Sequence, residues 1–291
     1  MLRTVKTSDV VTQMLATPGW MQAYQQMSPG PFHGLVRSLQ LEGVNVYEER
    51  MNTRVEQHFV APERALVFSF DACEQSLYVL NENSQNTWVT PPNYHEVAVV
   101  FSQEYLQEQG IAPDHLSGVL FSPLNSLQGR IFQGWLSKTL DKMNGVEVFD
   151  DRFAKQLLED CLFVVDCSSS LLDAGARSQR HVERQLVRRI FEFVGDHPDV
   201  AIRAPQLADA IGVSLRHLQR TFQAYMGLSP GQWLRLRNFN AAYRDLLRAD
   251  ASSTTVTDVA MCWSFWHLGR FSASYRALFG EYPSQTLQRR G

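Results

Sequence analysis

Cysteine is scarce in this chain of 291 residues, and its four cysteines show no C-x-x-C spacing: Cys73, Cys161, Cys167 and Cys262. This distribution argues against a disulfide framework and predicts reduced, mostly buried thiols, as in a cytoplasmic protein. No run of residues approaches the ~18 consecutive apolar residues that a membrane-spanning helix needs. The first residues also lack the apolar segment of a signal peptide. We therefore expect a cytoplasmic globular protein.

Sequence motifs of common enzyme classes are absent as well. The chain contains no G-x-S-x-G, no Walker glycine loop and no H-E-x-x-H. A metal-dependent enzyme on a cupin-like barrel would need two or three clustered histidines with a carboxylate. His33, His58 and His95 are isolated in the sequence instead. We therefore expect no metal site and no catalytic residues, and the cupin-type enzyme remains the weaker alternative.

Lysine is also scarce, and charge is divided unevenly along the chain. All four lysines precede residue 180, and the 15 basic residues of 180–291 are all arginine. With 9 acidic residues, this stretch carries a net charge of +6, whereas residues 1–179 carry −9. The planar guanidinium group pairs with phosphate and with guanine edges. A basic C-terminal part on an acidic body therefore indicates a nucleic-acid partner.

Short runs of β-branched and aromatic residues between residues 32 and 101 predict the strands of an N-terminal domain. Turn-forming segments separate the runs, of which the clearest are 43–48, 65–70, 77–80 and 97–101. Helical spacing follows in 102–109, capped by Ser102, in Leu124–Met143 and in Arg152–Val165. The predicted fold class is α+β, with an N-terminal cupin-like β-barrel or sandwich. The apolar helix faces could pair in a homodimer or pack on the barrel.

A small, polar segment from Cys167 to Ser178 predicts a linker between two domains. Such residues bury little apolar surface, so few contacts are expected there. We therefore divide the chain into residues 1–170, a sensing domain that could also dimerise, and residues 180–291, an all-helical domain.

The C-terminal part contains a weak internal repeat. Leu207, Ala208 and Ile211 are matched 52 residues later by Val259, Ala260 and Trp263. The second half of the repeat recurs 53 residues later, so that Leu218, Phe222, Gly227 and Pro230 correspond to Phe271, Tyr275, Gly280 and Pro283. The one-residue difference falls in the turn between the two helices of each copy, where an insertion is tolerated.

The first copy has the pattern of a helix-turn-helix unit. A helix beginning near Pro205 ends at Gly212, and Ser214 can cap the helix that follows. On this second helix, Leu218 and Phe222 lie on one face, and four polar residues lie on the other: Arg216, Gln219, Arg220 and Gln223. Arginine recognises guanine and glutamine recognises adenine in the major groove, so this face predicts base contacts.

The second copy is less polar at the equivalent positions. Its candidate DNA-binding residues are His267, Gly269 and Arg270, and for Trp266 we favour core packing. A helix over Gln232–Arg248 joins the copies and carries arginines available to phosphate or acidic partners: Arg235, Arg237, Arg244 and Arg248. Two reading helices about one DNA turn apart, ~34 Å, would enter successive major grooves.

Residues Val187–Leu287 resemble the AraC/XylS transcription regulators. The resemblance is carried by the string from Ala260 to Ser272, followed by Tyr275-Arg276, Phe279-Gly280 and Pro283. Family members usually carry glycine where Ser264 stands. The resemblance implies base contacts from Arg216, Gln219 and Arg220 and, in the second unit, from positions near His267, Gly269 and Arg270. A further outward position is Ala273, which offers only a methyl group, so less base readout is expected from the second unit.

The N-terminal part resembles the regulators of ethanolamine-utilisation operons. This resemblance is carried by 18–24, 28–34 and Val46-Tyr47-Glu48-Glu49-Arg50. In that branch the effectors are ethanolamine and a cobalamin cofactor, while related regulators respond to other amines, alcohols or aromatic acids. Candidates to line an effector pocket are aromatic and polar residues of the predicted strands: Tyr47, Arg50, His58, Phe68, Tyr78 and Trp88.

The main hypothesis is a DNA-binding transcription regulator that responds to a small metabolite such as an amine or alcohol. We expect it to act as an activator. Its expected partners are promoter DNA, RNA polymerase, the effector and a second copy of the chain. A DNA-binding repressor that needs no effector remains an alternative, because sensing leaves no compact motif. The operator, the effector and the direction of regulation are left open by the residues.

Overall fold

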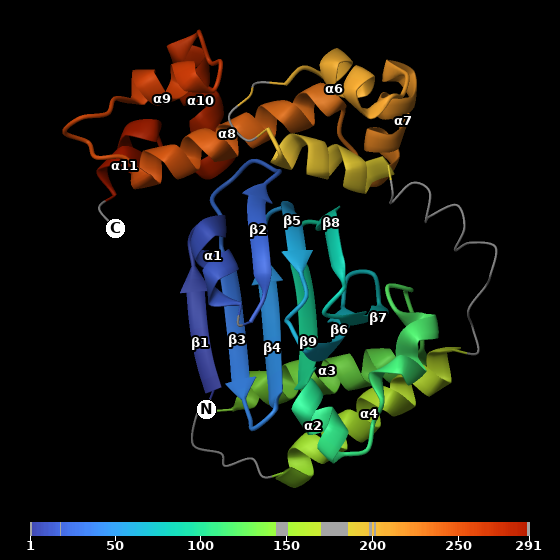
Figure 1. Ribbon diagram of the computed structural model, residues 1–291. Coiled ribbons are helices and arrows are strands. Elements are labelled where there is room, and N and C mark those ends of the chain that lie inside the picture. Colours follow the sequence, from blue (N-terminus) through green and yellow to red (C-terminus); the bar gives the residue numbers. More distant parts are fainter. Residues whose placement is uncertain are drawn as a thin grey trace.

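The computed structural model describes residues 2–17, 19–143, 151–169, 186–197, 200 and 202–289. Figure 1 shows a mixed sheet-and-helix N-terminal part, with a helical C-terminal part lying across one end of its strands. The predicted division into an N-terminal sheet-rich region and a C-terminal helical region is therefore present in the fold.

The N-terminal part contains two antiparallel sheets that face a common cavity. The larger sheet has the strand order β1 (Leu2–Thr7), β3 (Gly34–Gln40), β4 (Val44–Met51), β9 (Tyr94–Ser102), β6 (Ala65–Asp71), β7 (Ser76–Asn81). The smaller sheet has the order β2 (Met21–Gln26), β5 (Val55–Val60), β8 (Gln85–Val89). Among the described strands, none pairs from one sheet to the other, so the predicted cupin-like barrel is not closed. The arrangement is closer to the sandwich alternative.

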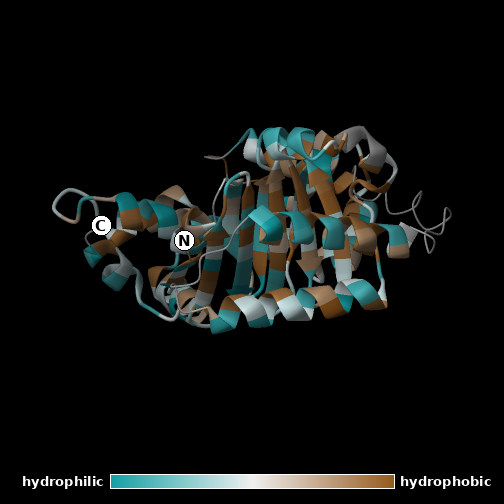
Figure 2. Ribbon diagram, turned by 90° about the horizontal axis from the view of Figure 1, so that it is seen from below, coloured by the Kyte–Doolittle hydropathy of each residue, from teal (hydrophilic) through white to brown (hydrophobic). Residues whose placement is uncertain are grey.

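Side chains alternate across the larger sheet, because successive residues of a strand point to opposite faces. One face carries apolar residues, including Phe68, Val97 and Val99, which pack against helices α3 (Leu127–Lys142) and α4 (Asp151–Ser169). The opposite face lies toward the smaller sheet and carries polar residues. Figure 2 shows hydrophobic positions occupying much of the strands, whereas the helices carry both kinds.

The helices of this part lie close to the predicted segments. Ser102 caps α2 (Gln103–Glu108) by accepting a hydrogen bond from the Tyr105 amide, and α1 (Val10–Ala16) was not predicted. The predicted linker is displaced, because Cys167, Ser168 and Ser169 belong to the last turn of α4. The rest of the predicted linker lies outside the described residues.

All four cysteines are free thiols, as expected, but the expectation that they are mostly buried is wrong. Cys161 is buried and Cys167 is partly buried, whereas Cys73 and Cys262 are exposed. Cys73 lies in the turn between β6 and β7 and Cys262 is the last residue of α9, two places where the apolar spacing of the sequence gives no information about burial.

The C-terminal part consists of two helix-turn-helix units joined by one long helix. The first unit, preceded by a helix over 186–195, contains α6 (Ala204–Ile211) and α7 (Leu215–Met226). The long helix is α8 (Pro230–Arg248), and the second unit contains α9 (Val256–Cys262), α10 (Leu268–Phe279) and α11 (Pro283–Gln288). Each unit has its own core, one around Leu218 and Phe222 and the other around Phe271 and Tyr275.

The internal repeat of the sequence is reproduced in the backbone hydrogen bonds of the two units. The amide of Val213 donates to the Ala208 carbonyl at 3.0 Å, and the amide of Phe265 donates to the Ala260 carbonyl at 2.9 Å. Both reading helices then end on a left-handed glycine, Gly227 or Gly280. The same turn geometry therefore occurs twice.

Ser264 occupies a position in the second turn that favours glycine. Its φ angle is 63°, and the equivalent Gly212 in the first turn has a φ angle of 74°. A residue with a β-carbon is strained in this left-handed conformation. The glycine usual in related proteins at this position is thus explained by backbone geometry.

Candidate nucleic-acid interface and ligand cavity

The polar face of α7 points to solvent. Arg216, Gln219, Arg220 and Gln223 are all exposed, whereas Leu218 and Phe222 on the other face are buried. Ser214 caps the helix by accepting a hydrogen bond from the His217 amide at 3.1 Å. The structure therefore presents four hydrogen-bonding side chains on one exposed helix surface, where base edges or phosphates could be reached.

The equivalent helix α10 presents a smaller polar surface. His267, Gly269, Arg270 and Ala273 are exposed. Trp266 is also exposed, with 69% of its surface accessible, so the core packing that we favoured for it is wrong. The residue precedes the helix, where helical spacing does not apply. An exposed indole beside Arg270 adds an apolar group to this surface.

Helix α8 fixes the spacing of the two units. It has 19 residues and therefore a length of ~28 Å at 1.5 Å per residue. Figure 1 shows α7 and α10 near opposite ends of this helix. This length is comparable with the ~34 Å between successive major grooves on one side of a duplex.

The arginines of α8 differ in their surroundings. Arg237 is held by Glu56 of the N-terminal part, and Arg235 lies over the rings of Phe239 and Phe265. Arg248 is exposed, while Arg244 is partly buried and burial lowers its pKa. Of the two kinds of partner expected for these arginines, phosphate or an acidic group, Arg237 has an acidic one, the Glu56 carboxylate.

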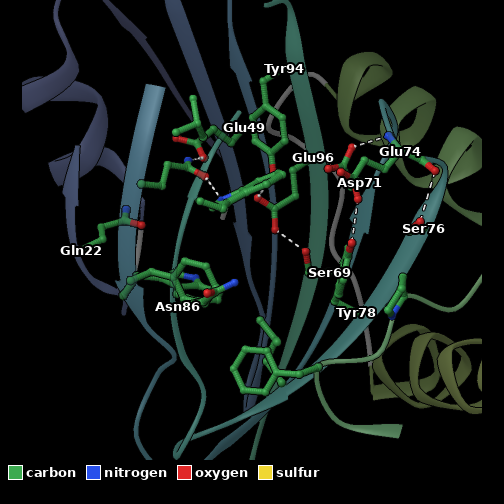
Figure 3. Close-up of a pocket in the computed structure, with 18 of the residues that line it drawn as sticks. Gln22, Glu49, Ser69, Asp71, Glu74, Ser76, Tyr78, Asn86, Tyr94 and Glu96 are labelled. Atoms are coloured by element: carbon green, nitrogen blue, oxygen red, sulfur yellow. Dashed lines mark hydrogen bonds between the residues drawn. The ribbon is translucent and has the colours of Figure 1, made fainter. Parts of the chain in front are cut away.

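A cavity of about 660 Å³ lies between the two sheets (Figure 3). All three strands of the smaller sheet contribute to its wall, as do strands of the larger sheet and the inner side of α7. Volumes of about 300–1,000 Å³ are typical of sites for small organic ligands. Its charged and aromatic lining residues are Glu49, Asp71, Glu74, Glu96, Trp20, Tyr24, Tyr47, Phe59, Tyr78, Trp88, Tyr94, Phe121 and Tyr225.

Two neighbouring glutamates of β4 have opposite surroundings because they point to opposite faces of the sheet. Glu48 lies on the helix side, where it binds Arg37 at 2.9 Å, Arg50 at 2.7 Å and His95 at 2.8 Å. Burial by itself would raise the pKa of Glu48, but hydrogen bonds from His95, Ser137 and Arg50 lower it to about 2. The negative charge of the Glu48 carboxylate is therefore balanced by neighbouring side chains of the protein.

Glu49 lies on the cavity side and has no cationic partner among the described residues. It accepts hydrogen bonds only from neutral groups, namely Gln13 at 3.0 Å, the Tyr24 hydroxyl at 3.0 Å and Gln57 at 3.0 Å. Burial and the nearby charge of Glu96 raise the pKa of Glu49 to about 8. At neutral pH this side chain is therefore mostly protonated.

Two further buried carboxyl groups complete an acidic lining. Glu96 accepts hydrogen bonds from Ser69 at 2.6 Å and from Tyr94 at 2.9 Å, and burial raises its pKa. Asp71 has its pKa raised to about 6, again mainly by burial. Figure 3 shows Glu49, Glu96 and Asp71 around the same cavity.

The sequence-predicted pocket residues divide into two groups. Tyr47, Tyr78 and Trp88 line the cavity. Phe68 is buried on the helix side, Arg50 is paired with Glu48, and the His58 ring bonds Thr87 at 2.7 Å. These last three lie away from the cavity, and the four acidic lining residues were missed. For Glu49, Asp71 and Glu96 the only signal in the sequence is an acidic residue at an inward position of a strand, whereas Glu74 lies in the turn between β6 and β7.

The back of the first reading helix forms part of the cavity wall. Tyr225 of α7 lines the cavity on the opposite side of the helix from Arg216, and Ala224, which is exposed and lies one turn beyond Arg220, lines it at the flank of the helix. The Tyr225 hydroxyl donates to the Thr87 carbonyl on β8 at 3.0 Å, and Arg54 donates to the Met226 carbonyl at 2.5 Å. One helix therefore separates the cavity from the candidate DNA surface.

Strand β5 connects the same two regions through adjacent residues. Gln57 lines the cavity and accepts a hydrogen bond from Trp88 at 2.8 Å. Glu56 points the other way and accepts hydrogen bonds from Trp233 and, at 3.1 Å, from Arg237 of α8. Glu56 is buried, so removing either partner would leave a poorly compensated charge.

The edge strand β2 anchors the long helix and the second unit. The side chain of Asn240 on α8 bonds both backbone groups of Gln26. Its Oδ1 atom accepts a hydrogen bond from the Gln26 backbone N–H at 2.7 Å, and its Nδ2 atom donates to the Gln26 backbone carbonyl at 2.9 Å. The Gln26 side chain donates to the Leu278 carbonyl of α10 at 2.6 Å. Both units are thus docked on the N-terminal part through backbone groups as well as side chains.

Within the described residues, no group of three or more histidine, cysteine or acidic side chains is arranged to hold a metal ion. The helices of that same part are also too short or too polar to cross a membrane.

Replacing Glu49 by glutamine tests its uncompensated charge. Because its pKa is raised to about 8 in the folded state, Glu49 favours folding below pH 4.5, and that contribution is lost as pH rises through 8. We expect Glu49→Gln to raise the melting temperature by about 5–10 °C at pH 9 and to leave it nearly unchanged at pH 5. Thermal unfolding followed by circular dichroism measures both.

Glu48→Gln is the matched control on the other face of the same strand. Its carboxylate is stabilised by ion pairs, so we expect this variant to lower the melting temperature at pH 7 and above. Equal effects of the two variants at pH 9 would contradict the assignment of their charge states.

Residues 207–289 match the protein family described as "Helix-turn-helix domain". Among curated relatives, the chain is 38% identical over 103 residues to the probable thc operon regulatory protein of Rhodococcus erythropolis. It is 34% identical over 102 residues to the XylDLEGF operon transcriptional activator 3 of Pseudomonas putida. Each match covers 35% of this chain, and the matched part spans 31% of each relative's length.

A solved structure shows the same similarity over the same share of the chain. It is a probable AraC family transcriptional regulator from Rhodopseudomonas palustris, 34% identical, with a TM-score of 0.33. The match covers 36% of this chain and 96% of that one. The C-terminal part of the chain accordingly contains a helix-turn-helix domain, and the curated relatives that it matches over this domain are transcription regulators.

Proposed function

We propose that the chain is a cytoplasmic, sequence-specific transcription regulator whose N-terminal part binds a small molecule. The observation that carries the proposal is the double role of α7. Its outer face exposes Arg216, Gln219, Arg220 and Gln223, and its inner face lines the cavity through Tyr225. A helix with DNA-reading groups on one side and a ligand cavity on the other is suited to convert ligand binding into altered DNA affinity.

The proposed DNA contacts follow from the two exposed helix faces. Arg216 and Arg220 could pair with guanine or phosphate, while Gln219 and Gln223 could pair with adenine. His267, Gly269 and Arg270 are the corresponding contacts of the second unit. The first unit offers more base-reading groups, so we assign it the larger share of sequence specificity and the second unit a larger share of positioning.

The proposed route of control passes through α7 and α8. A ligand in the cavity would contact Tyr225 directly and would act on Gln57, whose neighbour Glu56 holds Trp233 and Arg237. Such a ligand changes DNA binding only if it prefers one arrangement of these helices. The contacts across β5 and β8 are the ones that would have to differ between the two arrangements.

The ligand class suggested by the N-terminal resemblance is an amine or an alcohol, and the cavity size agrees with a small metabolite. Cobalamin, with its corrin ring and nucleotide tail, is far larger than the ligands that cavities of 300–1,000 Å³ hold. His58 on β5 and His95 on β9 also lie outside the cavity lining. The described cavity therefore does not fit cobalamin, and no role is assigned to it.

The direction of regulation that we propose is activation, with RNA polymerase as a partner. The support is that relatives of the C-terminal part include transcriptional activators, such as those of the XylDLEGF operon of Pseudomonas putida. The alternative of a repressor without an effector is disfavoured by a cavity with several buried carboxyl groups. Maintaining such groups without a ligand would cost stability.

A homodimer is the further partner that we propose, and an apolar stripe on α3 and α4 supports it. Leu127, Ile131 and Trp135 follow one another at intervals of four residues on α3 and are 58%, 64% and 42% exposed. Phe163 on α4 is 56% exposed. An apolar helix stripe of this kind is typical of a protein–protein contact, and a second copy pairing the same surface would bury it symmetrically.

Replacement of Arg220 tests the DNA-reading face. We expect Arg220→Ala to weaken binding to a selected DNA site by about 1–3 kcal/mol and to relax base preference at one position. The site can be selected from random duplexes with the full chain, and affinity can be measured by fluorescence anisotropy at several salt concentrations. Arg152→Ala on α4 makes the same charge change away from this surface and should bind normally. Equal losses in both variants would contradict the proposed interface.

Replacement of Ile131 tests the dimer. We expect the full chain to sediment as a dimer and Ile131→Asp to sediment as a monomer with unchanged circular dichroism, because a charge at the centre of the stripe would be desolvated on pairing. A monomeric unmodified chain at micromolar concentration, or a variant that remains dimeric, would contradict the assignment.

A further inference from the structure

We propose that the cavity is a site for an organic cation, specifically a protonated amine carried on an apolar or aromatic body. The site is defined by Asp71, Glu49 and Glu96 together with the aromatic residues around them. Its use as a sensor rests on the proposed function, whereas cation binding itself does not. The inference selects the amine among the effector classes that the sequence resemblance leaves open.

The charge of the lining is of one sign. Four acidic residues line the cavity, Glu49, Asp71, Glu74 and Glu96, and the described lining contains no lysine, arginine or histidine. Glu74 is the most accessible of the four and accepts a hydrogen bond from the Tyr78 hydroxyl at 2.7 Å. The ionised members of this set would repel an anionic ligand and attract a cation, and a bound cation would in turn favour the ionised form of Glu49.

Asp71 provides a second, independent observation. Its Oδ1 atom accepts hydrogen bonds from the amides of Cys73 at 2.7 Å and Glu74 at 2.9 Å. Its Oδ2 atom is buried and has no hydrogen-bond partner among the described residues, although only 3% of the residue is exposed. A buried carboxylate oxygen without a donor is costly, and an ammonium group in the cavity would supply that donor.

The contrast within β4 shows that the missing countercharge is specific to the cavity side. The protein surrounds Glu48 with Arg37, Arg50 and His95 on the helix side of the sheet. One residue later, Glu49 receives only neutral hydrogen bonds. A ligand cation would take the place that arginine and histidine occupy on the other face.

Aromatic rings supply the rest of the expected site. Trp88 and Tyr94 meet edge to face with their centroids 5.3 Å apart, and Trp20 and Phe59 meet similarly at 5.4 Å. Aromatic faces attract cations and also pack against apolar or aromatic groups. At about 660 Å³ the cavity has room for an amine with a ring or a branched chain.

Binding of such a cation should depend on pH, because it favours the ionised form of Glu49. The titratable groups that face Glu49 come from three strands, and the neutral amides come from α1 and β5: Tyr24, Tyr47, Tyr94, Glu96, Gln13 and Gln57. None of these groups is cationic, so the ligand would be the main charge that lowers the pKa of Glu49. We expect proton release on binding and an affinity that rises about tenfold between pH 6.5 and pH 8.

Three compounds that differ in one group test the inference on the full chain: 2-phenylethylamine, 2-phenylethanol and phenylacetate. Binding is followed by calorimetry and by the fluorescence of Trp20 and Trp88, which line the cavity. We expect the amine to bind at least about tenfold more tightly than the alcohol and the carboxylate not to bind. Calorimetry in buffers of different ionisation enthalpy reports the released proton.

Asp71→Asn is the decisive variant, since asparagine keeps the Oδ1 acceptor of the turn and removes the charge. We expect it to lower the amine affinity about tenfold and to leave the alcohol affinity unchanged. Asp151→Asn, an exposed position on α4, is the matched control and should bind the amine normally. An unchanged or higher melting temperature of Asp71→Asn would show that the variant is folded.

The inference is overturned if the alcohol or the carboxylate binds as tightly as the amine, if none of the three binds, or if Asp71→Asn retains the preference for the amine. DNA binding measured in parallel separates this outcome from failure of the proposed function. A chain that binds a selected DNA site but no amine would refute the cation site alone. A chain that binds the amine without any DNA binding would refute the regulator alone.

Discussion

The alternation of side chains along β4 and β5 is the constraint on which the rest of the structure depends. On β4 it places Glu48 among arginines and a histidine and Glu49 in a cavity without cations. On β5 it places Gln57 in the same cavity and Glu56 against α8. A single residue step therefore separates the ion-paired Glu48 from the cavity-lining Glu49, and the cavity-lining Gln57 from Glu56, which contacts α8.

The second consequence concerns α7. Its C-terminal turn closes one side of the cavity, and the same turn is held to β8 and to Arg54. The opposite face carries exposed arginines and glutamines. Because the helix is rigid over this length, movement of its inner side on ligand binding must also move its outer side. The coupling that we propose between ligand binding and DNA reading would therefore run through this one helix.

The helical part of the fold could be predicted from the sequence because its signals are local. The repeat at 52 and 53 residues, the cap at Ser214 and the glycine at Gly212 predict the helices and turns of the first unit. The exposed faces of α7 and α10 follow from helical spacing. The cavity could not be predicted in the same way, because Glu49, Asp71 and Glu96 meet only through strand pairing. In the sequence, an acidic residue that points into the cavity cannot be distinguished from one that points away from it until the register of the sheet is known.

The most direct test of the account is the coupling between the two sites. The affinity of the full chain for a selected DNA site is measured with and without a saturating cation, and the cation affinity is measured with and without DNA. The account predicts that both affinities change by the same factor, about 5- to 150-fold. A DNA affinity that is identical with the cavity occupied and empty would contradict it.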